Sequence, residues 1–382
     1  MSTLVVSDLH LGSRAGVDVL RQGSARRALE PSLAEVDRLV LLGDTLELRQ
    51  GPVREALAGA EATLGWLGEA MGEGEVVLVA GNHDHALVES WLDTRGADRA
   101  PPPLELEQIV EPATASWIAE RVARSVRARR PQLHVTVAYP GVWVCEDVYA
   151  THGHYLDLHS TLPAFERLAA GAMSRLAGSP PLHAPDDYEA LLAPIYAWIH
   201  TVAQRAESDG VTRGGASARA WRRLAGGQGG PLRARALASL VPLGIGAINR
   251  AGLGPVSPTL SREQVRRAGV RGMAAVSDAL DLSAQHVIFG HSHRAGPLPG
   301  DEPTEWRSDQ GVALLNAGCW VYETHFMPRP GPDSPFWPGR AVLVKDKGPP
   351  QLLGLLDDRS AEELVGASVR PSSTAQRRSP AE

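Results

Sequence analysis

The amino-acid sequence predicts an α/β fold, in which strands and helices alternate along the chain. Short apolar runs at residues 3–7, 36–42 and 75–80 are typical of buried strands. Between them, residues 17–30 and 53–71 carry apolar side chains at helical spacing. Each strand ends at a polar cluster, and ligands of α/β folds bind at the carboxyl ends of strands.

The rest of the chain continues this pattern with one long interruption. A helix is expected over about 113–129, and two or three strands over 133–151, where β-branched and aromatic residues are divided by Pro140-Gly141. Residues 158–282 have little strand character. Further strands are expected at 285–289, 312–315, 321–324, 341–345 and 351–355.

The segment 158–282 is predicted to be a helical insertion between strands of the sheet domain, which covers 1–157 and 283–366. Its expected helices lie at about 163–176, 186–207, 217–224, 232–250 and 261–280. The apolar stretch 237–248 has two open interpretations, an ordinary core helix or a contact with an acyl chain or membrane interface. Our hypothesis is that the insertion is a lid that determines substrate choice. Residues 367–382 are mostly polar and are expected to be disordered.

Composition indicates a globular protein with enough apolar residues for a large core. Of 382 residues, 43% are hydrophobic and 21% charged, and the net charge of −6 gives no sign of a basic nucleic-acid footprint. No stretch approaches the roughly 20 apolar residues of a membrane span. Cys145 and Cys319 cannot form a disulfide framework, and their apolar neighbours predict buried thiols in a reducing compartment. A cleaved signal peptide would remove the first strand and Asp8, so we expect a cytoplasmic protein.

Five polar clusters follow five apolar runs, and together they have the residue types of a metal site. Their residues are Asp8, His10, Asp44, Asn82, His83, Asp84, His152, His154, His291 and His293. Any one cluster could be a turn aspartate or a hydrogen-bonded core histidine, but five at strand ends indicate a metal site. Two divalent ions about 3.5–4 Å apart need a shared anionic ligand. The donors suit Mn, Fe, Zn, Co or Ni, and the absence of cysteine from the five clusters argues against a structural zinc site and for an open catalytic site.

These clusters closely resemble the signature motifs of the calcineurin-like metallophosphoesterases. The motifs, in the order of that family, are Asp8-x-His10, Gly43-Asp44, Gly81-Asn82-His83-Asp84, His152-Gly153-His154 and Gly290-His291-Ser292-His293. The resemblance covers the sheet domain and leaves out the insertion. It implies a four-layer α-β-β-α sandwich, with two mixed sheets flanked by helices. It also implies an enzyme that hydrolyses a phosphate ester, phosphodiester or pyrophosphate by attack of a metal-bridging hydroxide.

The resemblance further implies a role for each ligand in a centre of two divalent metal ions. One ion would be held by Asp8, His10 and His293, the other by Asn82, His152 and His291, with Asp44 bridging them.

The residues beside the ligands have expected roles in catalysis. His83 would face the substrate, stabilising the phosphoryl oxygens or protonating the leaving oxygen. Asp84 would orient the His83 imidazole, or cap a helix that begins at His85. Glu47 could contact metal-bound water or Arg14, or be a surface carboxylate.

Substrate contacts are a second set of expectations. His154 could touch the substrate, support a ligand or be structural. Arg14 and Arg294 are candidate phosphate clamps. Asp157 and His159 are weaker candidates.

Several classes of function stay open. Ser7-Asp8-Leu9-His10-Leu11-Gly12 and Gly43-Asp44-Thr45-Leu46-Glu47 look similar to the UDP-2,3-diacylglucosamine hydrolase branch, which cleaves a pyrophosphate in a lipid-linked nucleotide sugar. This insertion is longer than in that branch, and His83 stands where the branch has arginine. We therefore expect a phosphorylated small-molecule or lipid-linked substrate and no nucleic-acid partner. The alternatives are a DNA nuclease of the same superfamily, a non-catalytic scaffold with this fold, or a mononuclear hydrolase such as an amidohydrolase.

Overall fold

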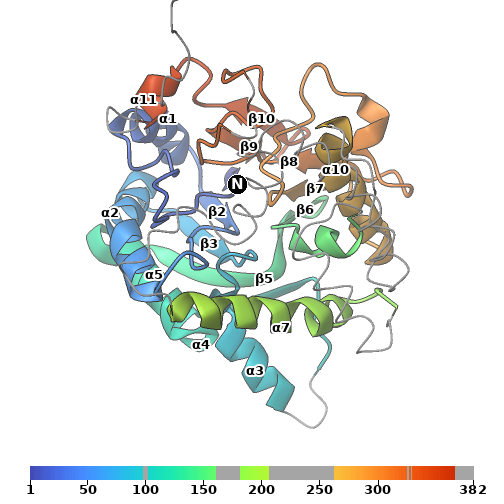
Figure 1. The fold of residues 1–382 in the computed structure, drawn as a ribbon, viewed down its shortest axis with the longest axis horizontal. Coiled ribbons are helices and arrows are strands. Elements are labelled where there is room, and N and C mark those ends of the chain that lie inside the picture. The colour runs from blue at the N-terminus through green and yellow to red at the C-terminus, as the bar shows by residue number, and fades with distance from the viewer. Residues whose placement is uncertain (98–101, 161–180, 206–261, 325–326, 328, 366–382) are drawn as a thin grey trace, which may run out of the picture.

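The predicted α/β class is confirmed. The computed structural model describes residues 1–97, 102–160, 181–205, 262–324, 327 and 329–365, which form a mixed α/β structure (Figure 1). Its ten strands build a large mixed sheet in the order β10-β9-β1-β2-β3-β5-β6-β7-β8, with β4 paired to β5. The strands are β1 Thr3–Val6, β2 Arg38–Leu42, β3 Glu75–Val79, β4 Glu107–Val110, β5 His134–Cys145, β6 Val148–Thr151, β7 His286–Phe289, β8 Ala313–Asn316, β9 Arg340–Val344 and β10 Gln351–Gly354.

Helices cover the sheet, and short 3-10 turns follow several strands. The α-helices are α1 Gly23–Ala34, α2 Val53–Met71, α3 Glu89–Ala97, α4 Pro112–Ala115, α5 Trp117–Val126, α7 Pro185–Gln204, α10 Arg262–Ala279 and α11 Ala361–Val365. The 3-10 turns are η1 His85–Leu87, η2 Arg127–Arg129, η3 His154–Leu158 and η4 Pro303–Trp306.

Strand β5 joins the two parts of the sheet because it changes neighbours half-way along its length. Residues 134–138 pair with β3 in parallel, and residues 141–145 pair with β6 in the antiparallel sense. The change falls at Pro140-Gly141, where proline has no N–H to donate to a neighbouring strand. The sequence predicts a break at this pair, but in the structure one strand runs through it.

Alternate residues of the central strands point to opposite faces, and both faces are buried. In β1, Leu4 and Val6 belong to a core shared with α1, α2 and α5, whereas Val5 points to a second core on the other face. In β7, Ile288 lies in that second core, and Phe289 points to a third core shared with α7 and α10. Because both faces are covered, these strands are continuous apolar runs in the sequence.

The described parts of the predicted insertion are α7 and α10, close to the helices expected at 186–207 and 261–280. Both belong to the third core, to which α7 contributes Tyr188 and Leu192 and α10 contributes Met273. None of the helices in the described ranges is long and apolar enough to cross a bilayer. The expectations outside the described residues concern 163–176, 217–224, 232–250, the apolar stretch 237–248 and the tail 367–382.

Some smaller expectations are wrong. The segment 321–324 forms no strand, because Val321 makes only an isolated bridge to Asp18. The same contact keeps residues 17–22 out of a helix, so α1 begins at Gly23. Ser116 divides the helix expected over 113–129, since its hydroxyl accepts the Ala119 N–H and caps α5.

The two cysteines are free thiols, as predicted. Cys319 is buried, but Cys145 is exposed at the end of β5, so the prediction of a buried thiol is wrong for Cys145.

Candidate metal centre

The five predicted polar clusters follow β1, β2, β3, β6 and β7, and the fold brings them together. Strands β1, β2 and β3 are mutually parallel, as are β6 and β7, so their carboxyl ends carry the clusters to the same region. His10 Nε2 lies 3.2 Å from His293 Nε2, although 283 positions separate the two residues in sequence.

The backbone of the predicted ligands is unusual. Among the described residues, positive φ outside glycine occurs at Asp8, His10, Asp44, Asp281, His291 and His293. All of these except Asp281 are predicted metal ligands. Left-handed backbone in such residues costs of order 1–3 kcal/mol each, and strain of this kind clusters at functional sites. The conformation therefore supports a functional site independently of the side chains.

Two glycines allow the ligands to approach one another. Gly43 has φ +81°, and a Cβ there would overlap the imidazole of His152. A Cβ at Gly81 would overlap the Asp44 carboxylate. The sequence therefore needs glycine at these positions because backbone and ligand are in direct contact.

The first ligand group is Asp8, His10 and His293, as expected for one metal ion. Asp8 Oδ1 lies 3.2 Å from His293 Nε2 and 3.9 Å from His10 Nε2. Asp8 Oδ2 accepts hydrogen bonds from the Ser7 hydroxyl at 2.6 Å and the His291 N–H at 3.0 Å. Oδ1 is buried and receives no hydrogen bond from any described residue. A divalent cation would satisfy this carboxylate oxygen, so the donor set fits a metal.

The second ligand group is Asn82, His152 and His291. The amide of Asn82 lies 3.1 Å from His152 Nε2 and 3.0 Å from His291 Nδ1. Asp44 Oδ2 lies 3.4 Å from His152 Nε2 and 3.7 Å from His10 Nε2. This oxygen thus faces a nitrogen from each group, which is the position that a bridging ligand requires.

Each ligand imidazole has its other nitrogen directed at an acceptor. The pairs are His10 with Glu47 at 3.3 Å, His152 with the Leu42 carbonyl at 2.9 Å, His291 with Asp157 at 3.0 Å and His293 with Glu323 at 3.7 Å. Such acceptors fix the tautomer and orientation of a metal-binding imidazole and increase its basicity. The four histidines are therefore oriented as a set.

The electrostatics of the centre favour a cation. Burial raises the pKa of Asp44, but the nearby His152 and His83 lower it, and the net result is a pKa well below the ordinary value. Burial alone would lower the pKa of His152, yet the Asp44 carboxylate raises it to about 9 overall. The buried carboxylates are thus ionised and draw positive charge, which a divalent ion supplies without a proton.

His83 lies at the edge of the centre and is partly exposed. Its side chain is 27% exposed, more than any of the ligand histidines, and its ring centroid is 4.6 Å from that of His10. Its Nδ1 lies 2.9 Å from Glu47 Oε2. Glu47 is therefore a buried residue that contacts both His10 and His83, and the surface-carboxylate interpretation is wrong.

Asp84 does not orient His83, so that prediction is wrong. Its Oδ1 accepts the N–H groups of Gly81 at 2.7 Å and Asp44 at 3.2 Å, and its Oδ2 accepts that of Leu46 at 3.1 Å. Asp84 precedes η1 but gives it no side-chain cap. It instead fixes the two ligand loops to each other.

The two predicted phosphate clamps are held by carboxylates. Arg14 forms an ion pair with Glu55 at 2.7 Å. Arg294 is buried, pairs with Asp301 at 2.5 Å and stacks on the ring of Trp306. The structure thus assigns both guanidinium groups to protein contacts.

A different arginine lies beside the centre. The guanidinium nitrogens of Arg49 lie 3.1–3.2 Å from the terminal amide atom of Asn82 that points away from His152 and His291. The guanidinium group also stacks on the ring of Tyr196 in α7, 5.3 Å from its centroid. No sequence motif points to Arg49, although it lies two residues after Glu47 in the same loop.

His154 is buried and lies 3.3 Å from the Tyr139 hydroxyl, through Nε2, with its ring 5.8 Å from that of His152. Burial and neighbouring histidines hold its pKa well below the ordinary value. These contacts place His154 in the buried region next to the predicted ligand His152. His159 contacts the Tyr188 hydroxyl at 2.8 Å.

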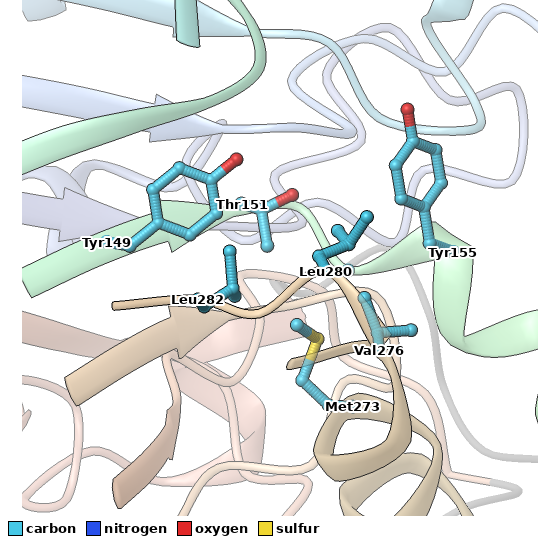
Figure 2. A pocket seen from close by; sticks show the side chains of 8 residues that line it. Tyr149, Thr151, Tyr155, Met273, Val276, Leu280 and Leu282 are labelled. Atoms are coloured by element: carbon cyan, nitrogen blue, oxygen red, sulfur yellow. The ribbon is translucent and has the colours of Figure 1, made fainter. Parts of the chain in front are cut away.

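A small cavity lies between α10 and β6. It is only about 10 Å³, enough for one water, and is lined mainly by apolar side chains. Figure 2 shows Met273, Val276 and Leu280 on one side of it and Tyr149 and Thr151 on the other. This cavity is a packing gap between α10 and β6, too small for a substrate.

Comparisons with known proteins give no assignment. No protein-family model matches the chain, and no curated protein matches it.

Proposed function

We propose that this protein is a binuclear metal-dependent phosphoesterase of the calcineurin-like type. The observation that carries the proposal is the position of Asp44 Oδ2, within 4 Å of a nitrogen from each of two separate ligand groups. The motif order of that family and the left-handed backbone of the ligands support it. In this proposal the three cores separate the four layers of an α-β-β-α sandwich.

The ligand chemistry is consistent with two divalent ions of the Mn, Fe, Zn, Co or Ni type. Asp8, His10 and His293 would hold one ion and Asn82, His152 and His291 the other, with Asp44 shared. Bound at these positions, the ions would polarise phosphoryl oxygens and lower the pKa of water.

The protein's own groups would orient and protonate the substrate. His83 Nδ1 is held by Glu47, so the opposite edge of the imidazole is available to a phosphoryl or leaving oxygen. With Nδ1–H donated to the carboxylate, the ring orientation is fixed, and protonation of a leaving oxygen would use a second proton, carried on Nε2. In this arrangement Glu47 takes the part that the sequence assigns to Asp84. The substrate would be a phosphate ester, phosphodiester or pyrophosphate, and the compartment cytoplasmic.

Metal content and hydrolysis test the proposal together. The full chain would be stripped with a chelator, reloaded with Mn²⁺ and assayed on bis-p-nitrophenyl phosphate, p-nitrophenyl phosphate, a nucleotide-sugar pyrophosphate, and single- and double-stranded DNA. We expect close to two ions per chain and hydrolysis of at least one non-DNA substrate. Cleavage of DNA alone would favour the nuclease alternative, and two bound ions without any hydrolysis would favour the scaffold.

A matched pair of variants makes the test specific. Asp44→Asn keeps the size of the side chain and tolerates left-handed backbone, so the change removes mainly the bridging charge. Asp281→Asn is the control, because Asp281 also has positive φ but belongs to neither ligand group. We expect Asp44→Asn to abolish hydrolysis and reduce metal content, and Asp281→Asn to do neither. Full activity of Asp44→Asn after metal return would refute the proposal.

A further inference from the structure

A buried carboxylate outside the five clusters comes from α7. Glu189 is 8% exposed, and its Oε1 accepts hydrogen bonds from the hydroxyls of Tyr139 at 2.6 Å and Tyr155 at 2.7 Å. Its Oε2 lies 3.1 Å from His85 Nε2. Burial raises the pKa of Glu189, but the hydrogen bonds, that from His85 first, lower it overall. A buried ionised group is retained only where such partners compensate its desolvation.

Two of these partners lie three residues beyond a ligand of the second group. His85 follows Asn82 at the end of β3, and Tyr155 follows His152 at the end of β6. Glu189 therefore joins the two loops that carry these ligands, although the loops come from strands that are not neighbours in the sheet.

The connection extends to the third ligand of the same group. Tyr155 and Asp157 both belong to η3, and Asp157 Oδ1 lies 3.0 Å from His291 Nε2. The Tyr139 hydroxyl also lies 3.3 Å from His154 Nε2, next to the His152 loop. Each of the three ligands of the second group is thus connected to the Glu189 carboxylate through neighbouring residues and their hydrogen bonds.

The first ligand group is supported from other elements. His10 contacts Glu47, His293 contacts Glu323, and Asp8 accepts from Ser7. These partners belong to the loops after β1, β2 and β8, and no residue of α7 is among them.

We propose that Glu189 is a positioning residue for the Asn82, His152 and His291 half of the metal centre. The predicted insertion then supplies part of the support of the centre and is not a removable lid. This inference rests on the proposed function, because it requires that the second group binds a metal ion.

Mn²⁺ binding to the full-length protein tests the inference. Wild type and variants would be stripped of metal and titrated with MnCl₂ by isothermal titration calorimetry, with metal content measured after gel filtration. Glu189→Leu removes both acceptors at similar volume, and Glu189→Gln retains one oxygen for the tyrosines. Tyr188→Phe is the matched control. Tyr188 precedes Glu189 in α7 and is buried in the same core, and the change keeps the ring that stacks on Tyr155 while removing only the hydroxyl that contacts His159.

We expect Glu189→Leu to lower the Mn²⁺ affinity of one of the two sites by at least about tenfold, which is the loss expected when the hydrogen-bond partners of metal ligands are removed. Glu189→Gln should restore most of the affinity, and Tyr188→Phe should bind both ions as wild type does. In a His293→Ala background, Glu189→Leu should weaken the remaining ion. In a His291→Ala background, it should leave the remaining ion unchanged.

Wild-type Mn²⁺ affinity at both sites in Glu189→Leu would overturn the inference. An equal loss of affinity in Tyr188→Phe would also overturn it. If Glu189→Leu does not fold, Tyr139→Phe and Tyr155→Phe replace it, each removing one hydroxyl, and wild-type affinity in both would overturn the inference. Wild-type protein that binds no Mn²⁺ would instead refute the proposed metal centre, and the inference with it. The two failures are therefore distinguishable.

Discussion

Replacement of Glu47 by glutamine should reduce turnover while leaving most of the bound metal. The carboxylate contacts His83 Nδ1 at 2.9 Å and His10 Nδ1 at 3.3 Å, and also accepts from the Arg49 N–H and the Gln50 amide. A glutamine amide has one acceptor oxygen, so its NH₂ group faces an N–H donor. Hydrogen bonds to charged groups contribute about 1.5–3 kcal/mol each, and the shorter contact, to His83, should be the more costly one to lose.

The expected loss in kcat/KM is about 10- to 100-fold, which corresponds to about 1.4–2.7 kcal/mol of transition-state stabilisation. Steady-state kinetics at saturating Mn²⁺ on the best substrate of the panel would measure it, with metal content determined on the same samples. His83→Ala should lower turnover with little loss of metal. If Glu47 acts through His83, Glu47→Gln should add little in a His83→Ala background. Full additivity of the two changes, or wild-type turnover in Glu47→Gln, would refute the reasoning.

Other parts of the structure give further predictions. Asp84→Asn should lower the free energy of unfolding by about 1–3 kcal/mol in urea denaturation, because the new amide directs an N–H at that of Leu46; unchanged stability would contradict this. Gly43→Ala should prevent normal metal loading, measured by metal analysis, since its Cβ would overlap His152 and its φ is +81°. Arg294→Met should lower the melting temperature without raising KM, whereas a phosphate clamp would raise KM. Mn²⁺ at 100 times its Kd should add about 2.7 kcal/mol of stability per site, and an unchanged melting temperature would contradict binding to the folded state.

The sequence predicts that the five clusters meet because this depends on a general property of the fold, whereas their division into two ligand groups is what the family resemblance implies. Polar residues that follow buried parallel strands meet at the carboxyl ends, whatever the details of packing. Asp8 and Asp44 could therefore be grouped from the ends of apolar runs alone, and the structure brings them together. The same reasoning brings His291 to this region across the insertion, and its place beside Asn82 is the one that the family resemblance implies.

The partners of the ligands depend on distances between segments that no local pattern encodes. Asp157 contacts His291 only because η3 packs beside the end of β7, and Glu189 reaches Tyr155 only because α7 lies against η3. Arg294 follows a ligand directly in sequence, yet its side chain is held by Asp301. Position after a strand end thus brings the predicted ligands together, whereas proximity in sequence does not identify the groups that contact them.

Asp84 and Glu47 have different partners because the backbone of the ligand loops is strained. Left-handed residues such as Asp44 interrupt the regular hydrogen bonding of the strand, so buried N–H groups in the loop need another acceptor. Asp84 provides it, accepting three backbone N–H groups with its two oxygens, and this leaves it no favourable geometry for an imidazole. Burial and the Asp44 charge raise the pKa of Asp84 to about 6, whereas the His83 and His10 imidazoles hold the pKa of Glu47 well below its ordinary value in spite of burial. Of the two carboxylates, Glu47 is thus the one that stays fully charged beside His83, as the orientation of a proton donor requires.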